Sequence, residues 1–555
     1  MPLINCRLFL ICMNKLFALL SNRYTSIVII FLSIVIRIIN VLFVSYYGRD
    51  KMFLVFQSKS LLQGKGLAVP QYFTSNTVTP VYDFTPLWPP GYPILLAPFL
   101  KLFNYNIYWA TTTLDIIFCV ALIFVTRKIC RQIGLPIAAI NIMTLIAGGF
   151  EYTFINESLP TDSISIVLFL IGLSQLIKLL TTKDFSIKKT ILVSFLLFLP
   201  CFFRYNYPAI SLATIVGVLF IAYIKKDILL KRKGWWVFMF NCFFTVAFFV
   251  FMKLLTGHVG YATPTQRGFY PENILHWFPI VPSSFINIAF LTSQAIHIAG
   301  ISFKTSMQWL ELINVIVIIS LLLFFLSALF RKKIFEDLSS LKLFLLLGAF
   351  ASAGLFALLG YMSLTYKRQM GFTNSWNYVY EPRYFAFAVL FFQIAFLSWY
   401  FIYFKKTLAK NVVVKILAGI CFFILFIEVS HNIYFHSKVA LNFKKYKSAV
   451  YREQDYSYYI SLIENIKDKY PDHEIWATAP GDNFYSYLAT YHGYIGIADA
   501  NNLKTNKVKV KTKTLLILML YNHEINAYQN FLSGNTILYN ERISNSNFYQ
   551  IELKP

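Results

Sequence analysis

The sequence predicts an all-α polytopic membrane protein with about eleven transmembrane helices, followed by a small α/β domain. Three observations predict this class. Of the 555 residues, 57% are hydrophobic and 14% are charged, whereas soluble globular chains carry about 25% charged residues. Apolar segments recur at close to the length of about 20 residues that spans a bilayer as a helix. After residue 430 the pattern changes to short mixed and strand-like runs.

The predicted transmembrane helices follow the apolar segments in order. They lie at 27–46, 107–126, 134–152, 163–180, 190–203, 207–224, 236–255, 312–330, 341–363, 384–404 and 412–430. Residues 1–26 contain an apolar stretch with basic flanks but no small-residue cleavage site, so we expect a cytoplasmic lead-in rather than a cleaved signal. The predicted units are therefore 1–26, the transmembrane domain 27–430 and the C-terminal domain 431–555.

The net charge of +25 indicates topology, because the basic residues cluster in every second loop. These loops lie near 127–131, 183–189, 225–233, 331–333 and 405–410. The positive-inside rule places them and the N-terminus in the cytoplasm. Eleven helices then put the C-terminus outside, together with the long loops 47–106 and 256–311. We expect no nucleic-acid partner, since the excess charge follows the loops and forms no separate basic region.

Cysteine and histidine give no sign of a metal site. The seven cysteines lie in the N-terminal segment or in or beside the predicted helices, and the C-terminal domain has none. Neither a disulfide framework nor a zinc site is indicated by their spacing. The eight histidines include no pair at metal-ligand spacing on a helix. We therefore expect no metal ion and no cofactor.

The C-terminal domain is predicted to mix helix and strand. A helix is expected at 458–469, and strands are expected at 474–479, 494–498, 515–520 and 548–553. By the topology above, this small α/β domain lies outside the membrane.

The first outer loop is the most informative segment of the chain. Asp50 follows the first transmembrane helix directly, where an ionisable group indicates function. The apolar residues 52–56 and 61–62 predict an amphipathic helix along the membrane surface, beginning at Lys51, and Gly64-Lys65-Gly66 ends it. The loop returns to the membrane through Trp88-Pro89-Pro90-Gly91-Tyr92-Pro93.

Four polar groups fall on this same outer side. They are Arg49-Asp50-Lys51; Glu151 with Asn156-Glu157 and Asp162; Arg204-Tyr205-Asn206; and Glu381-Pro382-Arg383-Tyr384, preceded by Lys367 and Arg368. A carboxylate can accept the proton of a hydroxyl nucleophile, and Arg or Lys can stabilise charge on a departing phosphate. The set therefore suits transfer from a lipid-held phosphate to a hydroxyl group.

The acidic candidates also have structural explanations. Asp50 can cap the helix that starts at Lys51, and Glu157 and Asp162 can interact with the dipole of the helix that follows Pro160. Asp115, inside the second predicted helix, needs a partner or water and is a weaker candidate.

The basic and aromatic candidates also have structural explanations. Arg204 and Arg383 can extend to lipid headgroups, while Trp88 and Tyr92 can belong to an interfacial aromatic belt. These alternatives stay open at the level of the residues.

The order of the motifs resembles the polytopic GT-C glycosyltransferases, in particular the bacterial branch related to protein O-mannosyltransferases and lipid A aminoarabinose transferases. The resemblance covers about residues 25–405. It rests on Asp50, Gly64-Lys65-Gly66, Pro89-Pro90-Gly91-Tyr92-Pro93, Glu157, Arg204 and Arg383-Tyr384. Two departures from the family pattern stand out. Lys51 stands where the family often has a second acid, so Glu157 or Asp162 would have to supply the second carboxylate. Trp88 stands where the aminoarabinose branch has a lysine, so the substrate of that branch does not carry over to this chain.

The resemblance implies a bacterial inner-membrane glycosyltransferase. It would transfer a sugar from a polyprenyl-phosphate-linked donor to a lipid, glycan or protein acceptor on the outer face. The implied roles are Asp50 as base and Glu157 or Asp162 as the residue that orients the sugar or supports Asp50. The implied phosphate ligands are Arg204, Arg383, Lys367 and Arg368, and the implied substrate-loop residues are Trp88, Tyr92 and Tyr384. An O-antigen ligase or polymerase-like enzyme, a transporter or lipid flippase, and a non-catalytic scaffold remain as alternatives.

Overall fold

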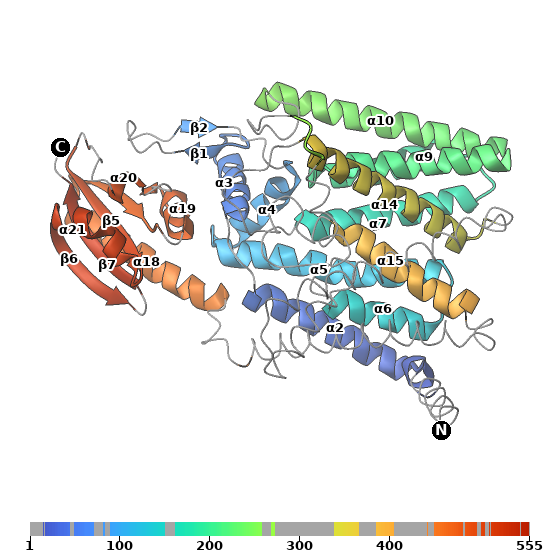
Figure 1. Ribbon diagram of the computed structural model, residues 1–555, viewed down its shortest axis with the longest axis horizontal. Coiled ribbons are helices and arrows are strands. Elements are labelled where there is room, and N and C mark those ends of the chain that lie inside the picture. The colour runs from blue at the N-terminus through green and yellow to red at the C-terminus, as the bar shows by residue number, and fades with distance from the viewer. Residues whose placement is uncertain are drawn as a thin grey trace.

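A computed structural model shows a bundle of helices with a smaller α/β unit beyond one of its ends (Figure 1). The structure describes residues 15, 17–44, 49–71, 81–83, 89–149, 161–257, 268–271, 338–365, 385–404, 441, 449–480, 483–496, 501–504, 510, 512–543 and 546–553. Helix α3 lies between the bundle and the α/β unit. The two parts are therefore joined through the first outer loop.

The described bundle consists of long apolar helices and shorter segments between them. Its elements are α2 (Arg23–Val44), α3 (Arg49–Leu62), α4 (Gly91–Leu102), α5 (Ile107–Gln132), α6 (Ile137–Gly149), α7 (Thr161–Thr181), α8 (Ile187–Phe198), the 3-10 turn η2 (Leu199–Phe202), α9 (Tyr207–Lys225), α10 (Ile228–Thr256), α14 (Ser340–Thr365), α15 (Ala386–Ser398) and the π-helical η6 (Trp399–Phe404).

Five of these helices are long and apolar enough to cross a membrane. They span Ile107–Gln132, Thr161–Thr181, Tyr207–Lys225, Ile228–Leu255 and Ser340–Met362. Each corresponds to a segment predicted from the sequence, and the chain is an integral membrane protein. The predicted helices 312–330 and 412–430 lie outside the described residues, so the total of eleven stays a prediction.

Local sequence sets the helix ends. Asn106 caps α5 by accepting a hydrogen bond from the backbone N–H of Trp109 at 3.0 Å. Asp227 caps α10 in the same way, with the N–H of Leu230 at 2.9 Å. Asn and Asp are preferred here because their side chains satisfy backbone donors that the first turn leaves free. Helix α10 ends at Gly257, whose φ of 73° lies in the left-handed region typical of C-terminal caps.

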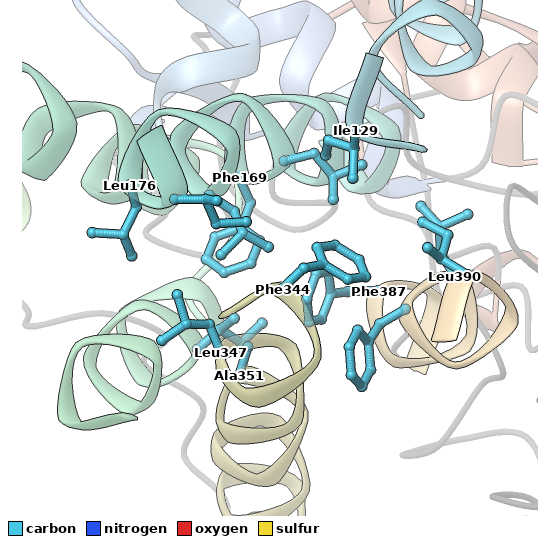
Figure 2. Packing of buried hydrophobic residues seen from close by; sticks show 14 of the residues in the cluster. Ile129, Phe169, Leu176, Phe344, Leu347, Ala351, Phe387 and Leu390 are labelled. Atoms are coloured by element: carbon cyan, nitrogen blue, oxygen red, sulfur yellow. The ribbon is translucent and has the colours of Figure 1, made fainter. Parts of the chain in front are cut away.

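The bundle core is aromatic and aliphatic. Phe169 of α7 and Phe387 of α15 meet edge to face with ring centroids 4.9 Å apart, and Phe344 of α14 packs into the same cluster (Figure 2). Helices α2 and α6 pack closely, because a Cβ added at Gly148 would lie 2.5 Å from the Cβ of Ser33. Small residues allow such close helix packing in membranes.

Helix α3 corrects the prediction for the first outer loop. The helix and its glycine end are present as expected, with Gly64 and Gly66 at φ of 72° and 66°. The helix is not a surface helix, however, since almost every described side chain between residues 51 and 60 is buried. It packs against α4 on one side and α19 (Asn483–Tyr491) on another. The short hairpin of β1 (Val69–Gln71) and β2 (Val81–Asp83) follows.

The C-terminal region contains a five-stranded mixed sheet in the order β4-β3-β5-β7-β6. Its elements are α18 (Ala449–Lys469), β3 (Glu474–Thr478), α19, β4 (Ile495–Gly496), α20 (Asn501–Lys504), β5 (Thr514–Tyr521), η7 (Ile525–Tyr528), α21 (Gln529–Ser533), β6 (Thr536–Ile543) and β7 (Ser546–Leu553). Strand β3 runs parallel to β4 and β5, and β7 runs antiparallel to β5 and β6. The edge strand β6 was not predicted from the sequence.

Candidate functional site

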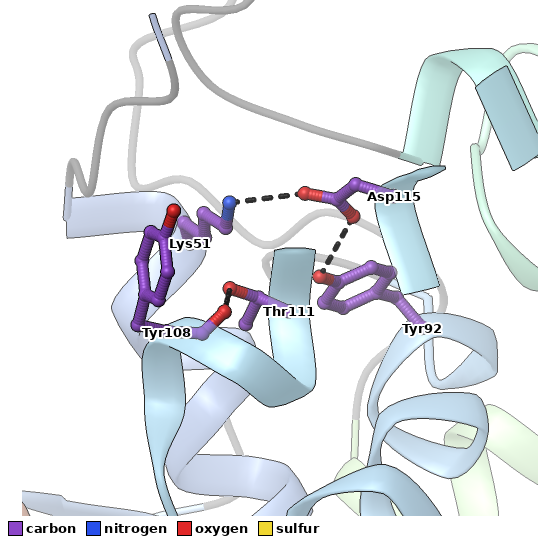
Figure 3. A network of polar contacts seen from close by, with 5 residues as sticks. All are labelled: Lys51, Tyr92, Tyr108, Thr111 and Asp115. Carbon is purple, nitrogen blue, oxygen red and sulfur yellow. Dashed lines mark hydrogen bonds and ion pairs between the residues drawn. The ribbon is translucent and has the colours of Figure 1, made fainter. Parts of the chain in front are cut away.

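A buried polar network joins the first outer loop to the bundle (Figure 3). The ammonium group of Lys51 donates to Oδ2 of Asp115 at 3.1 Å, and the hydroxyl group of Tyr92 donates to Oδ1 of the same carboxylate at 3.3 Å. Lys51 is 2% exposed, Asp115 7% and Tyr92 0%. Three helices thus meet at one carboxylate: α3 through its first turn, α4 through its second residue, and α5.

The proline-rich segment places Tyr92 in this network. Pro90 occupies the N-cap position of α4, and Gly91 is the first residue of the helix. A Cβ at Gly91 would lie 2.5 Å from the carbonyl oxygen of Phe202 and 2.9 Å from the ring of Phe203. The missing side chain therefore lets α4 start directly against η2, and Tyr92 then faces Asp115. The same contact brings the first outer loop next to Arg204.

Arg204 forms a second charge pair with Asp162. Its Nε donates to Oδ1 of Asp162 and its Nη2 donates to Oδ2, so the guanidinium group is held by both carboxylate oxygens. The Arg204 side chain is 3% exposed and that of Asp162 is 15% exposed. Asp162 lies in the first turn of α7. A two-point fork of this kind fixes the plane of the guanidinium group.

The two charge pairs belong to one region of the molecule. Apolar side chains next to each polar residue pack into a single cluster, which includes Leu114, Ile164, Phe203 and Tyr92. The arrangement therefore holds two carboxylates and two cations beside an apolar cluster that also contains Ile475 and Leu515 of the C-terminal sheet.

For the other predicted site residues, the structure describes only the backbone of Asp50. Helix α3 begins at Arg49, so Asp50 lies in its first turn and not at the cap of a helix starting at Lys51. Nothing is described of the Asp50 side chain. The remaining predicted residues, Trp88, Glu157, Lys367, Arg368, Arg383 and Tyr384, lie outside the described residues.

Two members of the site were underrated from the sequence. From the sequence, Lys51 is a departure from an acidic pattern, and Asp115 is a weaker candidate that needs a partner. Each is the partner of the other. The available signal was the requirement that a carboxylate inside a membrane helix be paired.

Among the described residues, no group of three or more His, Cys, Asp or Glu side chains lies close enough together to hold a metal ion. Next to Arg204, burial raises the pKa of the Tyr205 phenol above its ordinary value of 10.

Comparison with known proteins gives a result at the level of structure. No protein-family model matches the sequence, and no curated protein matches it. The structure of ArnT from Cupriavidus metallidurans in the apo state matches with a TM-score of 0.51 and 11% identity, over 94% of this chain and 97% of that chain. The chain has the fold of ArnT.

The match to ArnT extends over nearly the whole of both chains. ArnT is a GT-C aminoarabinose transferase, so the GT-C fold predicted from the motif order is confirmed. A second structure of ArnT from the same organism, bound to undecaprenyl phosphate, matches with a TM-score of 0.47 and 12% identity, over 95% of this chain and 96% of that chain. At such low identity the likeness concerns the fold.

Proposed function

We propose that this chain is a membrane glycosyltransferase of the GT-C type that takes its sugar from a polyprenyl-phosphate-linked donor. The acceptor would be a hydroxyl group of a lipid, glycan or protein on the outer face of the membrane. One observation carries the proposal: the Lys51–Asp115–Tyr92 network and the Arg204–Asp162 pair are buried side by side at one end of an ArnT-like bundle. That ArnT has been solved with undecaprenyl phosphate bound supports the class of donor.

The proposed reaction is a displacement at the anomeric carbon of the donor sugar. The acceptor oxygen forms a bond to that carbon, the bond from the carbon to the phosphate oxygen breaks, and the polyprenyl phosphate leaves with the bonding electrons. Asp50 accepts the acceptor's proton. Arg204 stabilises the negative charge on the leaving phosphate, together with Arg383, Lys367 and Arg368.

The charge pairs assign supporting roles to two residues. Asp162 accepts two hydrogen bonds from one edge of the Arg204 guanidinium and so orients it, which makes Asp162 a positioning residue in this proposal. Lys51 is bound to Asp115 and anchors the turn that carries Asp50. Glu157 supports Asp50, and Trp88, Tyr92 and Tyr384 belong to the substrate loop in the same proposal.

A transporter is less well supported, because such a protein needs polar residues along a path through the bilayer. Arg37 of α2 is a buried cation inside the predicted transmembrane helix 27–46. It donates two hydrogen bonds, of 3.0 and 2.7 Å, to the carbonyl oxygen of Ala147. This contact fixes α2 to α6, which favours a structural role for Arg37.

The test compares Asp50→Asn with wild type and with Asp472→Asn, a matched control at an exposed turn of the C-terminal sheet. Lipids and glycans of cells expressing each variant at equal level are profiled by mass spectrometry. We expect the glycosylated product to disappear in Asp50→Asn and to persist in Asp472→Asn. An unchanged product in Asp50→Asn would refute the assignment of the base.

A further inference from the structure

Helix α3 is held at both of its ends. Its first turn is bound to the bundle through Lys51 and Asp115. Near its other end, Lys59 contacts the C-terminal region: its ammonium group donates to the carbonyl oxygen of Tyr491 and lies 4.3 Å from the centre of the Tyr491 ring. A helix of 14 residues is about 21 Å long. The two anchors thus fix most of its length.

Tyr491 of α19 makes contacts with two other segments of the chain. It ends α19 and is 2% exposed. Its ring lies 6.4 Å from that of Phe56 of α3, and its hydroxyl group donates to the carbonyl oxygen of Tyr105 at 3.0 Å. Tyr105 belongs to the turn between α4 and α5, and its φ of 62° is uncommon for a residue with a side chain. Tyr491 therefore ties α3, the α4–α5 turn and α19 together.

Aromatic contacts extend the same interface along α3. The ring of Tyr487, one turn before Tyr491, lies 5.8 Å from Phe53 and 6.2 Å from Phe56, edge to face in both cases. Phe53 is two residues from Lys51. The interface with α19 therefore runs from the last turns of α3 almost to the candidate site.

We propose that Lys59 and Tyr491 form a clamp through which the C-terminal region holds α3, so that Tyr491 is a positioning residue for the site at the first turn of that helix. The inference rests on the proposed function in one respect, namely that Asp50 acts as the base beside the bound donor. Lys59 and Lys51 are eight residues apart, which corresponds to about 12 Å along a helix. Because an α-helix moves as a stiff rod, a shift at Lys59 displaces the turn that carries Asp50.

The experiment measures backbone amide exchange in the full-length protein in lipid nanodiscs. Lys59→Met removes the ammonium group and keeps the length of the side chain, while Tyr491→Leu removes the ring and the hydroxyl group. The matched control is Lys504→Met, because Lys504 is also a lysine beside a tyrosine ring, 5.3 Å from the centre of the Tyr528 ring, within the C-terminal region. Tyr491→Phe serves as a mild variant that loses only the hydrogen bond to Tyr105.

We expect exchange of the amides in residues 49–62 to become about tenfold faster in Lys59→Met and Tyr491→Leu, because loss of the clamp lowers the free energy of local opening. Tyr491→Phe should give a smaller increase, and Lys504→Met should leave exchange in α3 unchanged. Unchanged exchange in both Lys59→Met and Tyr491→Leu would overturn the proposal.

A second readout connects the clamp with the site. Binding of undecaprenyl phosphate to the same nanodiscs should weaken about fivefold or more in Lys59→Met and stay unchanged in Lys504→Met, a difference of about 1 kcal/mol by the relation between affinity and free energy. Faster exchange in α3 with unaltered affinity would show that the clamp does not position the site. If wild type fails to bind this lipid, the proposed donor is wrong, and the exchange data still decide whether the clamp exists.

Discussion

Replacing Lys51 by methionine should destabilise the protein by about 3–5 kcal/mol, the cost of breaking a buried ion pair by removing one partner. Two opposing terms determine this magnitude. At the observed separation of 3.1 Å, the attraction between the charges is about 5 kcal/mol for an effective dielectric constant of about 20. The desolvation of each buried ion costs several kcal/mol. Lys51→Met removes the attraction but leaves the Asp115 carboxylate buried.

The double variant Lys51→Met/Asp115→Leu separates these terms, because it removes both charges and both desolvation costs. Replacing a buried ion pair by apolar residues is often close to neutral, so we expect the double variant to be more stable than either single variant. Tyr92→Phe provides a scale, since it removes only the 3.3 Å hydrogen bond to Asp115, which is worth about 1 kcal/mol.

The assay is equilibrium unfolding by SDS in mixed micelles, followed by the fluorescence of the nine tryptophans. Wild type, Lys51→Met, Asp115→Leu and the double variant form a double-mutant cycle that gives the coupling energy between Lys51 and Asp115. A coupling energy well above 1 kcal/mol is expected for two charges in contact. A value below about 0.5 kcal/mol, as is usual for independent sites, would refute the pairing.

Three further predictions concern neighbouring features. Gly91→Ala should lower the free energy of unfolding by about 1–3 kcal/mol, the typical cost of overpacking, because the new Cβ would lie 2.5 Å from a backbone oxygen of Phe202; SDS unfolding measures it. Arg204→Lys keeps the charge but loses the fork to Asp162. Under the proposed function, affinity for undecaprenyl phosphate should therefore fall about tenfold, as measured in nanodiscs. Burial, and to a lesser extent Lys59, lowers the pKa of His492 from 6.5 to about 4. The unfolded chain therefore binds more protons between these values, and the stabilising contribution of neutral His492 is complete above pH 6.5 and lost as the pH falls towards 4. In His492→Gln, the melting temperature should depend less on pH between 4 and 6.5 than it does in wild type.

The long helices of the bundle could be predicted because lipid requires about 20 consecutive apolar residues, a signal that each segment carries by itself. Helix α3 shows the limit of this approach. Its apolar residues and the glycines after Leu62 indicated a helix, but its second buried face is covered by α19, more than 400 residues later in the chain. The local sequence pattern shows that this face is apolar but does not show what covers it. The sequence therefore predicted contact with membrane lipid, whereas the structure shows contact with α19.

The site was partly predictable for a similar reason. The residue types and their order placed Asp162 and Arg204 among the candidates, but their pairing depends on how η2 packs against the start of α7 and α4. Strand β6 was missed because its apolar side chains are half exposed at the edge of the sheet. A register irregularity between Ile537 and Tyr539 also breaks the alternation that identifies a strand.

The contact between Lys59 and Tyr491 has a consequence for the order of events during synthesis. The two residues are 432 positions apart, and a ribosome adds about 5–20 residues per second. Helix α3 therefore waits about 20–90 s after its own translation before α19 exists to cover it. During that interval its aromatic face is uncovered, and the first outer loop cannot adopt its final position. Assembly of the site is thus postponed until the chain is nearly complete, and fragments that end before residue 491 should lack the geometry required for activity.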